Sequence, residues 1–238
     1  MTMSILIDTT VCTACRACQV ACKQWHDLPA EQTTNTGGFQ NPENLSFFTY
    51  KLVRMNETII DDKLQWLFFP DQCRHCEDAP CLETAFDEQA IYRDSVTGAV
   101  IYTGQTRRLD AEEINYSCPY DIPRKGPDSI LAKCDFCNDR IHNGLAPACV
   151  TVCPTGAMQF GTRKKILAEA AERLEKVKKK FPGAALLDPE VTNVIYLVAF
   201  DPALYAKNAV AATRQPAGIS RQVALRRMMG PVARMMRI

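Results

Sequence analysis

The sequence lacks any run of about 18 apolar residues, the length that crosses a bilayer, so no transmembrane helix is expected. Its first residues do not form a basic segment followed by an apolar core and a small-residue cleavage site, so no secretory signal is expected either. The formal net charge of +1 gives no overall field that would attract nucleic acid. There is no glycine-rich phosphate loop after an expected strand, no Ser/His/Asp set and no flavin motif. These absences predict that the chain itself carries no catalytic site.

Cysteine, in contrast, is abundant, with 12 in 238 residues. A short secreted scaffold would use so many for disulfides, but this chain is longer and its cysteine spacings are typical of metal sites. The run Cys12, Cys15, Cys18, Cys22 has the C-x2-C-x2-C-x3-C spacing of bacterial [4Fe–4S] proteins. Three thiolates on such a loop bind one cluster, and the fourth binds the other cluster of a pair. Zinc is the alternative, although zinc sites usually use separated cysteine pairs rather than a quartet.

The other cysteines follow the same logic of three near ligands and one remote ligand. The run that begins at Cys134 ends in Cys153-Pro154, which is typical of a remote fourth ligand because proline turns the chain away from the cluster. Since two such runs exchange their fourth ligands, the sequence predicts three sets of four ligands. The first set is Cys12, Cys15, Cys18 and Cys153; the second is Cys134, Cys137, Cys149 and Cys22; the third is Cys73, Cys76, Cys81 and Cys118.

Apolar periodicity and turn residues predict the local elements. A helix is expected over residues 163–181, where apolar residues recur on one face and Pro182-Gly183 ends the pattern. A second helix is expected over residues 15–25, and residues 27–46 are expected to be irregular. Strands are expected at 5–7, 47–54, 65–69, 91–92, 99–102 and 194–200.

Four segments resemble one known family. They run from Cys12 to Trp25, from Trp66 to Cys76, from Ser117 to Arg124 and from Ala148 to Ala157. As a set they closely resemble the small subunits of soluble formate dehydrogenases from sulfate-reducing bacteria, which belong to the four-cluster, ferredoxin-type electron-transfer subunits of molybdenum and tungsten oxidoreductases. The resemblance covers about residues 5–205.

The family pattern has sixteen cysteine ligands, and this chain departs from it at four positions. Where the pattern has cysteine, this sequence has Ala85, Arg108, Ala111 and Ile114. The resemblance implies that these four positions make up the complete ligand set of one cluster. It therefore implies three [4Fe–4S] clusters, with Arg108 and Ile114 filling the former fourth site.

The resemblance also implies a fold of class α+β, with two interleaved ferredoxin-like [4Fe–4S] modules, a small strand-rich insertion, and a C-terminal helix and strand. Residues 1–26 and 125–162 are expected to form the first module with two clusters, and residues 66–124 the second with one cluster. Residues 27–65 are expected to form the insertion, residues 163–213 the helix and strand, and residues 214–238 a basic tail.

The implied function is electron transfer from a catalytic large subunit to a soluble acceptor such as a multihaem cytochrome c, within a heterodimer. That large subunit would carry a tungsten or molybdenum bis-pterin cofactor and one further [4Fe–4S] cluster. The complex is expected in the periplasm, exported with the partner subunit, the alternative being the cytoplasm. Two other functions stay open: electron transfer for a related enzyme, such as a transhydroxylase or a sulfur or arsenate reductase, and a zinc-bound interaction module.

Two features allow two interpretations each. His75 lies between Cys73 and Cys76, where it either packs beside the loop or tunes the cluster by charge or hydrogen bonding. The tail from Arg214 carries six arginines and no acidic residue, so it is either a flexible or partner-docked arm or a membrane-surface segment.

Overall fold

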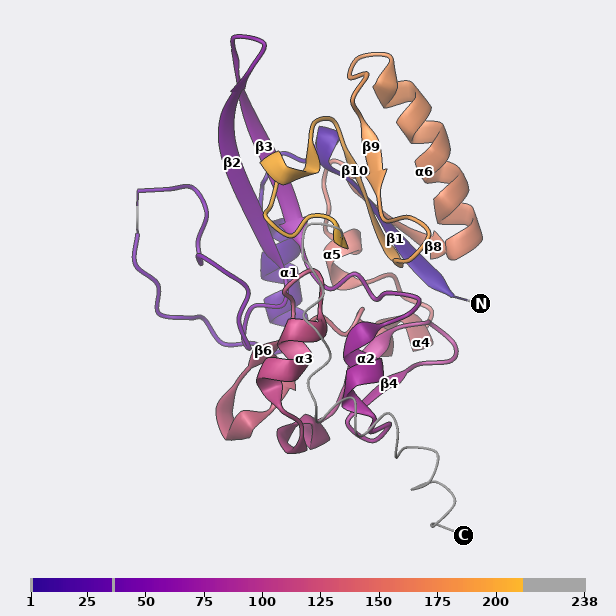
Figure 1. Cartoon of the computed structure of the whole chain (residues 1–238). Coiled ribbons are helices and arrows are strands. Elements are labelled where there is room, and N and C mark those ends of the chain that lie inside the picture. The colour runs from indigo at the N-terminus through magenta and orange to yellow at the C-terminus, as the bar shows by residue number, and fades with distance from the viewer. Residues whose placement is uncertain (1, 36, 212–238) are drawn as a thin grey trace.

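A four-stranded sheet joins the two ends of the part of the chain that the computed structural model describes, residues 2–35 and 37–211 (Figure 1). The strand order is β8-β1-β10-β9. Strand β1 (Met3–Asp8) pairs in parallel with β10 (Val194–Val198) and antiparallel with β8 (Met158–Thr162). Strand β9 (Ala185–Leu187) pairs antiparallel with β10 at the edge of the sheet.

The two faces of this sheet bury different partners. Because side chains alternate along a strand, Leu6 and Ile195 point to one face, where α6 (Arg163–Lys178) covers them. Ile5 and Tyr196 point to the other face and pack in a core that also contains buried cysteines. The long helix therefore covers one face of the sheet, and the cysteine loops pack against the other face.

A long hairpin projects from the body of the molecule (Figure 1). It is formed by β2 (Leu52–Ile60) and β3 (Lys63–Asp71), which pair antiparallel along their whole length. The expected strand over residues 47–54 was wrong in its bounds, because the strand begins at Leu52 and continues to the turn. Asp61 and Asp62 have φ of 50° and 57°, the positive values that a tight two-residue hairpin turn requires.

The remaining elements are short and carry most of the cysteine loops. The helices are α1 (Ala17–Trp25), α2 (Pro80–Ala85), α3 (Ala111–Ser117), α4 (Asn138–His142) and α5 (Ala148–Thr151). The two-stranded ribbons pair β4 (Ile91–Arg93) with β5 (Val100–Tyr102) and β6 (Arg124–Lys125) with β7 (Leu131–Ala132). Single 3-10 turns occupy Thr9–Val11, Gly104–Arg108, Pro127–Ser129 and Pro202–Leu204.

Several expected elements are confirmed, with small shifts at their ends. The short N-terminal strand, the 91–102 hairpin, the long helix and the strand at 194 are all present. The long helix ends at Lys178 rather than at residue 181, and the last strand ends at Val198. Residues 27–46 contain no helix or extended strand among those described.

The expected segment boundaries cut across two of these elements. Strand β3 runs through the boundary between residues 65 and 66, and the central sheet combines β8 with β9 and β10 from beyond residue 163. The arginine-rich tail from Arg214 lies outside the described residues. Within the described part of the chain, no helix has the length and apolar character needed to cross a membrane.

Candidate metal centres

The three Cys-x-x-Cys loops that begin the cysteine runs, at Cys12, Cys73 and Cys134, share one backbone feature. The residue before the second cysteine is left-handed in each, with φ of 52° at Ala14, 48° at His75 and 69° at Phe136. A residue with a side chain pays roughly 1 kcal/mol or more for this conformation, which persists where a site demands it. The backbone N–H groups of His75 and Phe136 donate to the Sγ atoms of Cys73 and Cys134, each at 3.4 Å. The bend therefore turns amide donors toward the sulfurs, as a thiolate ligand loop requires.

The third set surrounds one small cavity. Cys73 and Cys76 come from the loop that follows β3, Cys81 from the first turn of α2, and Cys118 from the residue that follows α3. All four side chains line the same cavity. Helices α2 and α3 thus bring Cys118 to three cysteines that lie far away from it in the sequence.

The second set surrounds another small cavity. Cys134 and Cys137 follow β7, Cys149 lies in α5, and all three line this cavity together with Cys22 of α1. The structure therefore separates Cys22 from the three cysteines that precede it in its own run. Helix α1 contacts α5, and Cys22 lies one turn beyond Cys18 along α1, so its side chain reaches the cavity that Cys149 of α5 also lines.

The first set lies at the surface of the described chain. Burial raises the pKa of Cys12, and the neighbouring Cys153 and Cys15 add to that effect. Cys18 also lies near Cys12 and Cys15. The four cysteines are thus brought together, with Cys15 exposed and Cys12 and Cys153 half-buried.

The chemistry of these thiols favours metal binding over disulfides. None of the 12 cysteines is in a disulfide. Burial raises the pKa of Cys18, Cys118 and Cys137 to about 12, so these thiols are protonated at neutral pH when they are free. A metal displaces those protons, and its positive charge compensates the buried thiolates.

A buried donor tests whether the third cavity fits an iron–sulfur cluster. His75 is fully buried, and its Nδ1 accepts a hydrogen bond from the backbone N–H of Val100 at 3.0 Å. Burial, followed by the charges of Lys133 and Arg93, lowers the pKa of His75 well below its usual range, so the ring is neutral with its proton on Nε2. No described residue accepts from that Nε2, although the ring lines the cavity. A cluster with sulfur acceptors fits this donor, which favours the tuning interpretation of His75 over simple packing.

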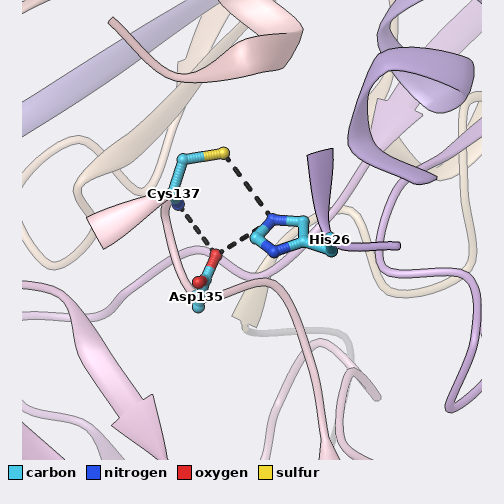
Figure 2. Close-up of side chains that lie close together, drawn as sticks. All are labelled: His26, Asp135 and Cys137. Atoms are coloured by element: carbon cyan, nitrogen blue, oxygen red, sulfur yellow. Dashed lines mark hydrogen bonds and ion pairs between the residues drawn. The ribbon is translucent and has the colours of Figure 1, made fainter. Parts of the chain in front are cut away.

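His26, Asp135 and Cys137 lie close together at the edge of the second cavity (Figure 2). His26 Nε2 is 3.7 Å from the Cys137 Sγ and 3.3 Å from an Asp135 oxygen, and the Cys137 backbone N–H donates to the same carboxylate at 2.8 Å. The three could hold an ion of their own, but Cys137 and His26 both line the second cavity. The group therefore belongs to that candidate centre, where the His26 ring lies beside the Cys137 sulfur.

The positions of the missing fourth ligand set are filled mainly by apolar side chains. Ala85, Ala111 and Ile114 pack in one hydrophobic cluster, and Ile114 is only 2% exposed. The expectation that Arg108 also fills this space was wrong, because its side chain is 48% exposed and pairs with Asp87 at 2.9 Å. A charged group would be costly in this apolar cluster, so it extends to the surface instead.

The sequence did not identify three of the residues that line the cavities. His26 could have been found, since it follows Cys22 by four residues, the spacing that places two side chains on one helix face. Lys51 and Lys133 could not, because a lysine in sequence is ordinarily a surface residue, whereas both are buried here. Only the folded arrangement shows that Lys51 lines the second cavity and Lys133 the third.

Comparison with known proteins identifies the family. The profile of the 4Fe-4S dicluster domain matches residues 64–163, which include eight of the cysteines described above. The formate dehydrogenase subunit beta of Megalodesulfovibrio gigas is 54% identical over 215 residues, a match that covers 89% of this chain and 100% of that protein. The formate dehydrogenase 2 subunit beta (cytochrome c-553) of Nitratidesulfovibrio vulgaris is 46% identical, covering 88% of this chain and 99% of that protein.

A more distant relative has the same kind of name. The formate dehydrogenase-O iron-sulfur subunit of Escherichia coli is 39% identical over 207 residues, covering 84% of this chain and 68% of that protein. Sequence identity of 39% to 54% with these three proteins extends over nearly the whole described chain, including the cysteine loops and the cavities. The chain belongs to the family of formate dehydrogenase beta subunits, the iron–sulfur subunits of these enzymes.

Proposed function

We propose that this chain carries three [4Fe–4S] clusters and passes electrons from the catalytic subunit of a formate dehydrogenase to a soluble acceptor. The observation that carries the proposal is the gathering of all 12 cysteines into three groups of four, two of them around cavities. The clusters would supply one-electron transfer, and the protein would hold them in line and adjust their potentials. The chain itself would be non-catalytic.

The ligand assignment follows the three sets. Cys12, Cys15, Cys18 and Cys153 would hold one cluster, Cys22, Cys134, Cys137 and Cys149 a second, and Cys73, Cys76, Cys81 and Cys118 a third. The apolar filling around Ile114 supports a count of three rather than four. In this scheme residues 1–26 and 125–162 make one ferredoxin-like module, interleaved with a second module over residues 66–124.

Contacts between the sets support a linear order with the second set in the middle. Burial raises the pKa of Cys22, and Cys149 and Cys137 of its own set contribute further. Cys149 also lies near Cys18 of the first set, and Cys134 lies near Cys73 of the third. Electrons would therefore cross from one end set to the other through the second.

The surfaces at the two ends suit two kinds of partner. Near the first set, Val20 is 53% exposed and Val152, next to Cys153, is 39% exposed. Exposed apolar side chains around a half-buried site suit a permanent subunit interface. Near the third set the exposed residues include the apolar Phe86 and Tyr116 but also the charged Asp78 and Lys125, and charged rims suit brief encounters. We infer that the catalytic subunit docks at the first set and the acceptor at the third.

We infer that the acceptor is a soluble cytochrome c of the multihaem type in the periplasm. The name of the Nitratidesulfovibrio vulgaris relative includes cytochrome c-553, which supports a cytochrome as the class of acceptor. Export would depend on the catalytic subunit, with its tungsten or molybdenum bis-pterin site, carrying a signal for folded proteins. Cell fractionation tests this location: the complex should appear with periplasmic markers, and its recovery with cytosolic markers would contradict the proposal.

Copurification tests the function as a whole. The native complex is expected to oxidise formate with a viologen dye and to reduce a cytochrome c, and the catalytic subunit without this chain should keep only the dye reaction. The complex should be brown and bleach with dithionite, because thiolate-bound iron absorbs visible light whereas zinc is colourless. Cytochrome reduction that persists without this chain, or a colourless zinc protein, would contradict the proposal.

A further inference from the structure

Lys51 is a buried cation beside the proposed middle cluster. Only 2% of the residue is exposed, and it directly precedes β2. Its Nζ donates to the Gln72 Oε1 and to the Pro70 carbonyl oxygen, the latter at 3.4 Å. Both acceptors are neutral, so the hydrogen bonds do not balance the charge.

A comparison with another buried cation shows what Lys51 lacks. Arg74 is equally buried, and it forms an ion pair with Asp71 at 3.0 Å. Lys51 has no carboxylate partner within the described part of the chain. Keeping an ammonium group charged in the interior is expensive unless an opposite charge is close. The structure must therefore supply a negative charge near Lys51 from something other than Asp or Glu.

The groups that face Lys51 are the proposed cluster ligands. The side chain lines the second cavity together with Cys22, Cys134 and Cys149. Cys18 of the first set also lies near Lys51. Because Cys18 belongs to the first set, Lys51 lies between the first and second sets. A cluster bound by four thiolates would provide the missing negative charge.

We propose that Lys51 is the fixed positive charge that raises the reduction potential of the cluster held by Cys22, Cys134, Cys137 and Cys149. This inference rests on the proposed function, since it requires a cluster at that site. When such a cluster accepts one electron, its negative charge increases by one and no proton is needed. A nearby ammonium in a low-dielectric interior stabilises that added charge more than it would in water. The positive charge of Lys51 would also act on the first-set cluster, because Cys18 lies near Lys51.

Two properties make this role useful for electron transfer. The second set lies between the other two, so a very negative potential there would obstruct each passing electron. A lysine that is held by Gln72 and Pro70 and shielded from water keeps its charge in place and unscreened by salt. Lys51 is thus a positioning residue that acts through charge and does not bind iron.

The test is a redox titration of the holo-complex, monitored by electron paramagnetic resonance, on wild type and five variants. Lys51→Met removes the charge with little change in volume, Lys51→Gln removes it but can still donate to Pro70, and Lys51→Arg keeps it. Lys179→Met, at an exposed position on the far end of α6, is the matched control. The second-set signal is identified by its loss in Cys22→Ser.

Lys51→Met and Lys51→Gln are expected to weaken reduction of the second-set cluster at least tenfold, which is a downward shift of about 59 mV for a one-electron couple. Lys51→Arg and Lys179→Met should stay within about threefold, or about 28 mV, of wild type. The proposal is overturned if Lys51→Met and Lys51→Gln leave the potential of the second-set cluster within that threefold range. It is also overturned if Lys51→Arg shifts this potential as far as Lys51→Met does. If Lys51→Met alone prevents cluster assembly, the potential measured in Lys51→Gln tests the proposal. Failure of the proposed function would differ, because wild type would then lack the cluster signal altogether.

Discussion

Replacing Cys22 with serine is expected to remove the second-set cluster, about four iron atoms per chain, and to stop the reduction of cytochrome c by formate. The reason lies in the fold, because Cys22 lines the cavity of Cys134, Cys137 and Cys149. Losing the middle site would interrupt the proposed path from the first set to the third. Formate oxidation with a small dye should persist, since that reaction needs only the catalytic subunit and its nearest cluster.

The matched control is Cys15→Ser in the same run. Cys15 is exposed and lies near Cys12, so its replacement should perturb the first-set signal and leave the second-set signal intact. The two variants would be measured by iron content, electron paramagnetic resonance and both activity assays. The proposed exchange of fourth ligands between the runs that begin at Cys12 and Cys134 is wrong if Cys22→Ser removes the same signal as Cys15→Ser.

Reversing charges at the rim of the third set is expected to change cytochrome reduction while leaving the dye reaction within about twofold. Asp78→Lys and Lys125→Glu alter exposed positions close to the loops that carry Cys76 and Cys118. Because steering by charge acts mainly on the association rate, the two reversals should shift that rate in opposite directions, by roughly tenfold at low salt, and converge at high salt. Stopped-flow mixing of the formate-reduced complex with cytochrome c measures the rate directly.

The control for this series is Lys179→Glu, which changes an exposed charge beyond the end of α6, away from α2 and α3 (Figure 1). Arg124 is unsuitable as a rim position, because it donates to the Leu45 carbonyl oxygen at 3.0 Å and pairs with Asp121 at 3.2 Å. Its reversal would disturb the loop itself. If Lys179→Glu changes the rate as much as Asp78→Lys does, the third set is not the exit.

The cysteine pattern predicted much of the candidate site because ligand spacing is a local property. A Cys-x-x-Cys loop must bend around a metal wherever it lies, and Ala14, His75 and Phe136 adopt that bend in all three loops. The sequence also marks Cys118 and Cys153 as remote positions, since proline follows each of them. The strand pairing that brings these loops together could not be predicted. Strand β1 pairs in parallel with β10, and the paired residues lie nearly 190 positions apart in sequence.

Charge was the property that the sequence predicted least well. Arg108 was expected inside the former fourth site, yet Asp87 holds it at the surface. Lys51 looked like an ordinary surface lysine, yet Gln72 and Pro70 hold it beside the second cavity. In both cases the partner lies about 20 residues away in sequence, and neither spacing nor composition indicates it. Burial of a charge depends on the whole fold.

The most direct test of the account is an iron anomalous difference map from anaerobic crystals of the native complex. We expect three cluster-sized peaks on this chain, one in contact with each set, and Cys22 beside the same peak as Cys134 and Cys149. The apolar cluster around Ala85 and Ile114 should contain no iron. A fourth peak there, or Cys22 beside the peak of Cys12 and Cys15, would contradict the account.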